Sequence, residues 1–153
     1  MNDATLQFTR ADYLRVLAEV GMTHEQVLAM TENTNDQMPM PTGFDFLHLA
    51  PSPIAGTGLF TTKAMTPGAV IGPARINGKR TPLGRYANHS PWPNTEFHPL
   101  ANGDMESVAL CLIPVGGEIL NDYRQGAKLW GAEFDAQEVS KTLRERQSYE
   151  SLG

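Results

Sequence analysis

The sequence predicts a mostly β fold with a smaller α part (α+β), and three observations support this class. From Phe44 onward, short apolar pieces alternate with glycine and proline turns, which is typical of short strands. Helical periodicity is confined to the two ends of the chain. The chain has 153 residues, which is about one domain, and its 14 glycines and 11 prolines suit a body rich in turns.

Two short helices are predicted near the N-terminus. Thr9–Asp12 has the pattern of a capping box, and apolar residues at helical spacing follow it up to Gly21, a natural helix end. A second box, Thr23–Gln26, begins the second helix. A helix pair can read DNA, but the second helix carries Glu25 and no lysine or arginine, so it would repel phosphate. A lid, or a hairpin that pairs two copies into a homodimer, is the better interpretation.

The remaining elements are predicted from apolar runs between turns. Ser107–Ile113 is the strongest strand, an apolar run ended by Pro114. The other strands are expected at 44–49, 58–61, 69–71 and 118–120, and a C-terminal amphipathic helix is expected within 133–152. The domain prediction is a helical extension and linker at 1–43, a central domain at 44–125 and a helical flanking segment at 126–153.

Composition excludes several classes of protein. Twelve basic and 17 acidic residues give a formal charge of −5, which disfavours general nucleic-acid binding because that affinity rests on phosphate neutralisation. One cysteine, Cys111, excludes an internal disulfide and a zinc site of several thiolates. No apolar run approaches the ~20 residues of a membrane span, and the polar start has no signal-peptide core. We therefore expect no membrane partner and an intracellular, cytoplasmic location.

Three stretches carry chemical groups. In Ser52–Phe60, Gly56 and Gly58 form a Gly-x-Gly pattern that allows close backbone approach to a ligand, although a plain turn between strands would look the same. Arg85–Asn94 contains Asn-His-Ser followed by two prolines. Ile113–Tyr123 contains a turn, a short strand and a terminal tyrosine.

Taken alone, these stretches leave other chemistries open. The Gly-x-Gly pattern lacks the third glycine and the following helix of a dinucleotide site. His89 and His98, with Asp104 and Glu106 nearby, could hold a metal ion, but the regular spacing of metal ligands is missing and we expect no metal. Ser90 beside His89 lacks the context of a nucleophile elbow.

In this order and spacing, the three stretches resemble the SET domain of protein-lysine methyltransferases, over roughly residues 45–125. Arg85–Asn94 resembles the Arg-aromatic-x-Asn-His-Ser-x-x-Pro-Asn segment of that family, and Glu118–Tyr123 resembles its Gly-Glu-Glu-hydrophobic-x-x-Asp-Tyr segment. The resemblance implies small curved β-sheets with a knot-like C-terminal crossing, of the compact type found in viruses and bacteria, which would extend the expected location to a host cell interior. It also implies S-adenosyl-L-methionine as cofactor.

The resemblance assigns roles residue by residue. Tyr123 corresponds to the catalytic tyrosine, which aligns a lysine amine. The residues that would bind the cofactor are Ala55, Gly56, Thr57, Gly58, Leu59, Arg85, Asn88, the backbone of His89, and Trp130 stacking on adenine. The lysine channel would be formed by Tyr86, Trp92 and Tyr123.

Two departures from the family pattern stand out. The second tyrosine, which the family places upstream of Asn-His-Ser, is missing, because Gly68–Gly78 contains no aromatic residue. The other channel wall must then come from elsewhere, and the candidates are Tyr86, Trp92, Phe97, Trp130 and Tyr149. The segment Arg75–Gly84, which builds the peptide groove in the family, is very short.

The function expected from the sequence is methyl transfer to a lysine side chain of a protein, such as a histone-like or other basic protein. The first rival is a SET-like binding module that has lost turnover. The second is a metal-dependent enzyme that uses His89, His98 and nearby carboxylates.

Overall fold

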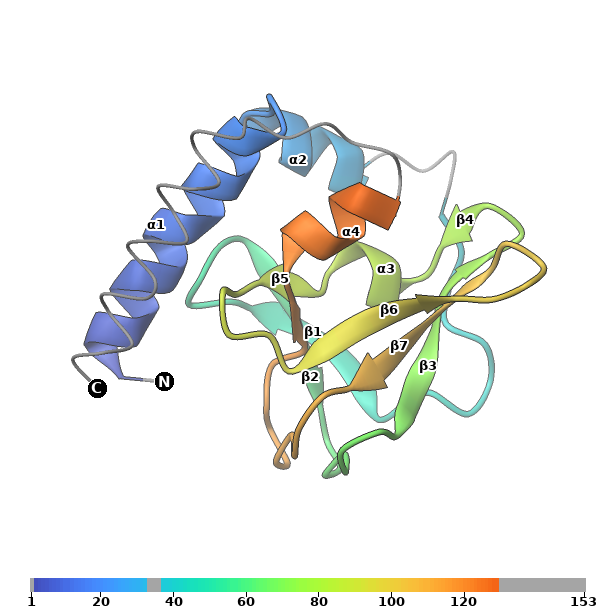
Figure 1. Ribbon diagram of the computed structural model, residues 1–153. Helices are drawn as coiled ribbons and strands as arrows, with labels where there is room; N and C mark the ends of the chain where they lie inside the picture. Colours follow the sequence, from blue (N-terminus) through green and yellow to red (C-terminus); the bar gives the residue numbers. More distant parts are fainter. Residues whose placement is uncertain (1, 33–36, 130–153) are drawn as a thin grey trace.

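The computed structural model describes residues 2–32 and 37–129 and has a mixed α/β fold with small sheets (Figure 1). The helices are α1 (Asp3–Glu19), α2 (His24–Glu32), α3 (Pro82–Arg85) and α4 (Tyr123–Leu129). The strands are β1 (Leu47–Pro51), β2 (Thr57–Thr61), β3 (Val70–Ile76), β4 (Lys79–Arg80), β5 (Asn88–His89), β6 (Thr95–Pro99), β7 (Met105–Ala109) and β8 (Leu120–Asn121). No helix among these residues is both long and apolar enough to cross a membrane.

The strands form three sheets. β1 and β2 are an antiparallel pair, β4-β3-β7-β6 is an antiparallel sheet of four strands, and β5 pairs in parallel with β8. The main hydrophobic core lies between these sheets and α3, and its buried members are Leu59, Met65, Ile71, Leu83, Ala87, Ala109, Ile113 and Ile119. This arrangement agrees with the predicted α+β class of small sheets, whereas the knot-like crossing remains a prediction.

The N-terminal helical pair is stabilised at its ends by local hydrogen bonds. Asn2, and not Thr9, caps α1, since its side chain accepts the Thr5 N–H at 2.7 Å. Gly21 (φ +73°) ends α1 in a Schellman motif, in which the Met22 N–H bonds to the Leu17 carbonyl at 2.8 Å. The predicted box at the start of α2 is confirmed: Thr23 and Gln26 each donate a backbone N–H to the other's side chain.

The strongest predicted strand is misplaced. β7 begins at Met105 and ends at Ala109, where its pairing with β6 ends at Thr95. Leu110 and Leu112 are 43% and 60% exposed, so the apolar run is not a buried strand. The prediction followed apolar content, while cross-strand pairing sets the actual bounds. β6 was not predicted at all, because its sequence, Thr95–Pro99, alternates weakly and ends in proline.

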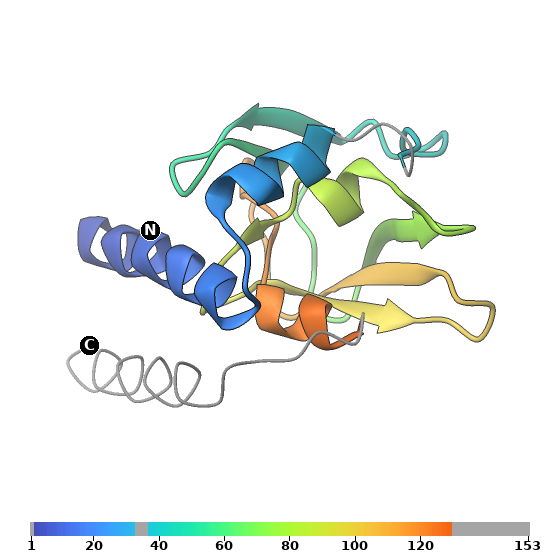
Figure 2. The same ribbon diagram turned by 90° about the horizontal axis from the view of Figure 1, so that it is seen from above.

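The helical pair borders the β body on one side, and α4 lies beside the turn between α1 and α2 (Figures 1 and 2). The buried face of α1 carries Thr9, Asp12, Tyr13, Val16, Leu17 and Glu19. The apolar residues that follow Thr9–Asp12 at helical spacing include Leu14, which was therefore expected on the buried face, but Leu14 is 59% exposed. The predicted domain boundary after residue 125 falls inside α4. The predicted helix within 133–152 lies outside the described residues.

We predict that Gly84→Ala destabilises the protein by about 1–3 kcal/mol. A Cβ at Gly84 would meet the backbone carbonyl oxygen of Ala74 in β3, which cannot move without disturbing the sheet. The measurement is chemical denaturation monitored by circular dichroism. Lys79→Ala, at an exposed position of neighbouring β4, is the control and should change stability by no more than about 0.5 kcal/mol. Equal stability of Gly84→Ala and wild type would refute the close packing of α3 on β3.

Candidate functional site

Two cavities of about 240 Å³ each adjoin at Tyr123. We call the first the polar cavity; its lining residues are Tyr13, His24, Val27, Ala55, Gly56, Thr57, Arg85, Tyr86, Asn88 and Tyr123. We call the second the apolar cavity; its lining residues are Val16, Leu17, Val20, Met22, Val27, Arg80, Gly84, Arg85, Ala87, Phe97, Asn121, Tyr123, Gly126 and Ala127. Val27, Arg85 and Tyr123 line both cavities, so these three residues form the wall between them.

The loop that joins β1 to β2 forms one side of the polar cavity. The Ser52 N–H bonds to the Gly56 carbonyl at 2.8 Å, and Gly56 has a φ of +49°, a conformation that favours glycine. This tight turn brings the backbone of Ala55, Gly56 and Thr57 to the cavity. Close approach of this backbone to a ligand remains a prediction for these three residues.

Asn88 fastens this loop to β5. Its side-chain amide donates to the Ala55 carbonyl at 2.7 Å and to the Ser52 hydroxyl oxygen at 3.0 Å, and its Oδ1 accepts the His89 N–H at 2.9 Å. Both amide hydrogens are thus used within the protein. Asn88 therefore holds the cavity wall in place, and only its side-chain oxygen can accept a further hydrogen bond from a ligand.

Arg85 and Tyr86 also line the polar cavity. The Arg85 guanidinium lies 4.7 Å from the centre of the Tyr86 ring, and its Nη2 donates to the Tyr86 hydroxyl at 3.0 Å. None of the ten residues that line this cavity is acidic. The cavity therefore presents a cation, hydrogen-bonding groups and aromatic faces, a combination that suits a ligand with a carboxylate and an apolar part.

Tyr123 lies at the junction as an uncharged phenol. Burial raises the pKa of Tyr123 well above its usual value, and the neighbouring Tyr13 and Glu118 raise it further. Its hydroxyl donates to the Ala87 carbonyl at 3.3 Å, and its ring lies against the rings of Tyr13 and His89. A hydroxyl that stays protonated can orient a ligand but cannot act as a strong base.

The remaining predicted site residues lie elsewhere. Leu59 is a core residue with 1% exposure, and a Cβ on the buried Gly58 would meet the Glu118 carboxylate. His89 is fully buried and does not line the polar cavity; its backbone N–H is already bonded to Asn88. Trp92 contacts Phe8 of α1 at 5.3 Å between ring centres and lines neither cavity. Trp130 and Tyr149 lie outside the described residues.

Tyr13 and His24 are cavity residues that sequence reasoning missed. The Tyr13 hydroxyl lies 2.8 Å from His24 Nδ1, and the Tyr13 ring packs edge-on to Tyr123 with 6.1 Å between ring centres. Tyr13 thus provides a second aromatic wall beside Tyr123, from the N-terminal helix instead of from Gly68–Gly78. A sequence signal existed, because Asp12 and Glu19 share the buried stripe of α1 with Tyr13 and Val16. Acids on an apolar stripe indicate a face that packs on a polar site.

The histidines and carboxylates do not gather as the metal hypothesis requires. His98 Nε2 contacts Glu96 at 2.6 Å, whereas His89 Nε2 contacts Asp12 at 2.6 Å. Within the described ranges, no group of three or more His, Cys, Asp or Glu side chains is arranged to hold a metal ion.

Comparison with known proteins gives little further information. No protein-family model matches the chain, and no curated protein matches it. Among solved structures, one similar chain is a Plasmodium falciparum protein described as a "putative histone methyltransferase". The identity is 22%, the TM-score is 0.37, and the match covers 50% of this chain and 91% of the other. Likeness at this level does not assign a function, so the chemistry of the two cavities must do so.

We predict that Glu118→Gln gains stability relative to wild type as the pH rises from about 4 to about 8. Burial raises the pKa of Glu118 and outweighs the hydrogen bonds with the side chains of Ser52 and Asn88, which lower it. The folded state therefore holds the Glu118 proton more tightly than the unfolded state, and wild type loses stability as this carboxyl ionises. Glutamine carries no such penalty. Denaturation midpoints across this range, with Glu106→Gln as the matched control, measure the effect; a pH-independent difference would contradict it.

Proposed function

We propose that this chain transfers a methyl group from S-adenosyl-L-methionine to the side-chain amine of a lysine in a protein substrate. One observation carries the proposal. Residues from three segments distant in sequence line one cavity, namely Ala55–Thr57, then Arg85, Tyr86 and Asn88, and finally Tyr123. They are parts of the three stretches that resemble the SET motifs, and convergence on one cavity is what a shared ligand would require.

The polar cavity has groups that fit the amino-acid end of this cofactor. A carboxylate suits the Arg85 side of the cavity, and an ammonium suits backbone carbonyls and the Asn88 oxygen. The volume of about 240 Å³ is below the ~300–1,000 Å³ of pockets that bury most of a drug-sized ligand. The cavity therefore suits part of the cofactor, and the adenosyl group would extend from it.

The apolar cavity suits the alkyl chain of a lysine. Its wall is mainly aliphatic, from Val16, Leu17 and Val20 of the N-terminal helices, and its charged lining residues, Arg80 and Arg85, are both cationic. Desolvation and like charge both lower the pKa of an entering ammonium, so the wall favours the unprotonated amine. The formal charge of −5 of the whole chain would still attract basic protein segments.

Tyr123 would align the reaction between the two cavities. S-adenosylmethionine supplies a methyl group on a sulfonium, which the amine lone pair attacks in line while the S–C bond breaks and its electron pair stays on sulfur. The chain itself has to orient the amine, exclude water and release one proton to solvent. The uncharged Tyr123 hydroxyl and the Ala87 carbonyl can orient the amine, and the rings of Tyr13 and Tyr123 can exclude water.

We predict saturable one-site binding of S-adenosylhomocysteine to wild type, weakened at least about tenfold in Asn88→Ala. The substitution removes the clamp between β5 and the Ala55 loop, so the cavity wall loses its shape. Isothermal titration calorimetry measures the affinity. Asn102→Ala, in the exposed turn between β6 and β7, is the matched control and should bind as wild type does.

A labelled-methyl assay on basic proteins then tests transfer, with Tyr123→Phe as the reference variant. Retained S-adenosylhomocysteine binding with lost transfer supports the role of the Tyr123 hydroxyl. Binding without transfer by wild type, across a broad panel of basic substrates, would support the binding module instead. Absence of binding by wild type would overturn the proposal.

We predict that Tyr13→Leu weakens S-adenosylhomocysteine binding by about 5- to 30-fold, the equivalent of about 1–2 kcal/mol. The substitution removes an aromatic wall of the polar cavity and the partner of His24. Tyr13→Phe keeps the ring and separates its effect from that of the hydroxyl. Leu14→Ala, at the exposed adjacent position of α1, is the control. Unchanged binding by Tyr13→Leu would remove the N-terminal helices from the site.

A further inference from the structure

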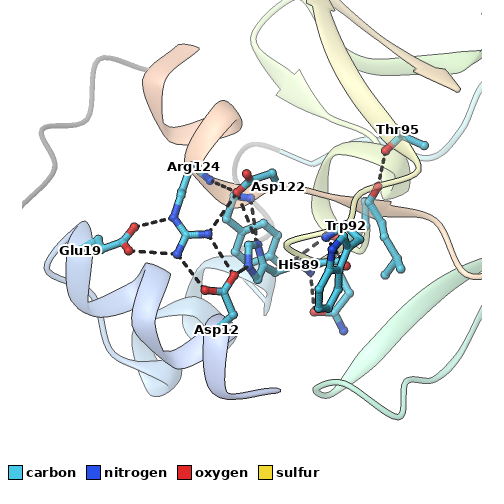
Figure 3. A network of polar contacts seen from close by, with 12 residues as sticks. Asp12, Glu19, His89, Trp92, Thr95, Asp122 and Arg124 are labelled. Carbon is cyan, nitrogen blue, oxygen red and sulfur yellow. Dashed lines mark hydrogen bonds and ion pairs between the residues drawn. The ribbon is translucent and has the colours of Figure 1, made fainter. Parts of the chain in front are cut away.

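Asp12, His89 and Tyr123 form a chain of hydrogen bonds from the N-terminal helix to the junction of the two cavities. Figure 3 shows Asp12 between His89 and Arg124. Asp12 Oδ2 lies 2.6 Å from His89 Nε2, and the Tyr123 backbone N–H bonds to His89 Nδ1 at 3.1 Å. The side chains of Asp12 and His89 are fully buried. The three residues come from α1, β5 and the first position of α4.

The hydrogen bonds define the tautomer of His89. A backbone N–H can only donate, so Nδ1 must be unprotonated to accept it. The ring proton then lies on Nε2, which donates to the Asp12 carboxylate. Tyr123 is the first residue of α4, where a backbone N–H has no partner within the helix, so His89 supplies the missing acceptor.

Arg124 holds Asp12 in the orientation that this tautomer needs. Its Nη1 donates to Asp12 Oδ2 at 3.0 Å and its Nη2 to Oδ1 at 2.9 Å, while Nε donates to Glu19 at 2.8 Å. Burial alone would raise the pKa of Asp12, but the hydrogen bonds from His89 and Arg124 outweigh it and lower the pKa to about 2. Asp12 is therefore a carboxylate whose two oxygens both accept.

We propose that Asp12 is a positioning residue for Tyr123: by fixing the tautomer of His89, it holds the backbone of Tyr123 at the wall between the two cavities. The inference rests on the proposed function for the role of the Tyr123 hydroxyl. It makes α1 a working part of the site, since the position of Tyr123 depends on a side chain 111 residues earlier in the sequence. Asp122, whose Oδ1 lies 3.9 Å from His89 Nδ1, caps α4 by accepting the Arg124 N–H at 2.9 Å.

An asparagine at position 12 cannot accept hydrogen bonds from both His89 and Arg124 in the way that the two oxygens of Asp12 do. With its oxygen toward His89, its NH₂ group would face the Arg124 guanidinium, donor against donor. With its NH₂ group toward His89, the ring proton would move to Nδ1 and face the Tyr123 N–H. A similar exchange of carboxylate for amide beside the histidine of a serine protease triad lowers the rate about 10⁴-fold, because the histidine then adopts the wrong tautomer.

The test compares Asp12→Asn with Glu19→Gln in the full chain. Both variants remove one acid from Arg124, but only Asp12 contacts His89. Proton–nitrogen correlation NMR of the histidine rings reports which nitrogen of His89 carries the proton. We expect the Nε2-protonated form in wild type and Glu19→Gln, and a mixed or Nδ1-protonated form in Asp12→Asn. Methyl transfer should fall at least about tenfold in kcat in Asp12→Asn, with a smaller change in KM.

Each outcome decides the inference. A single Nε2-protonated form and wild-type kcat in Asp12→Asn would overturn it, as would equal losses of kcat in the two variants. If Asp12→Asn fails to fold, wild type carries the test: a His89 ring protonated at Nδ1 would overturn the proposal. The NMR result does not depend on any activity. A correct tautomer in wild type without methyl transfer would refute the proposed function alone.

Discussion

The segment from Glu118 to Asn121 is hydrogen-bonded along both of its sides, and the site depends on this. On one side the Ile119 N–H bonds to the Leu59 carbonyl of β2 at 2.8 Å. On the other side the Asn94 side chain donates to the Glu118 carbonyl and accepts the Leu120 N–H, each at 2.8 Å. This segment therefore lies between the strand that contains Gly58 and the loop that contains Asn-His-Ser, and it sets the distance between them. Tyr123 begins α4 two residues after the segment ends. Hydrogen bonds depend steeply on distance and angle, so they hold this segment in position more narrowly than side-chain packing alone would.

The polar network behind Tyr123 costs free energy to bury, and its charged groups are paired with one another. Asp12 and Glu19 are both buried and share the single guanidinium of Arg124. The free-energy cost of moving three charged groups out of water is offset only when these groups make hydrogen bonds within the protein. His89 contributes to this by donating to the carboxylate that Arg124 also contacts. A network of this sort does little for net stability compared with an apolar core, whereas its directional hydrogen bonds favour one defined geometry.

Features that depend on residues close together in the sequence were predicted correctly, whereas features that depend on distant partners were not. The capping box at Thr23 involves residues three apart, so the sequence alone predicts it. The similar pattern at Thr9 is not a helix start, because Asn2 offers an earlier cap and Thr9 is buried inside α1. The strand at Met105–Ala109 is set by its partners β3 and β6, which no local pattern contains. For the site, motif order predicted that Ala55–Thr57, Arg85, Asn88 and Tyr123 converge. Tyr13, His24 and Asp12 reach the site only through the docking of α1, which no motif describes.

The bond between Arg124 and Asp12 joins residues 112 positions apart, and this separation has a consequence during protein synthesis. A ribosome releases α1 long before it has made the residue that neutralises the Asp12 carboxylate. Until Arg124 emerges, the buried stripe of α1 carries two acids without their cation, and docking against the β body would leave them uncompensated. Contacts between residues far apart in sequence also form late, because the chain loses the entropy of loop closure before such a contact contributes any favourable free energy. The two cavities are therefore among the last of the described features to form, because their walls are incomplete until α4 has been translated.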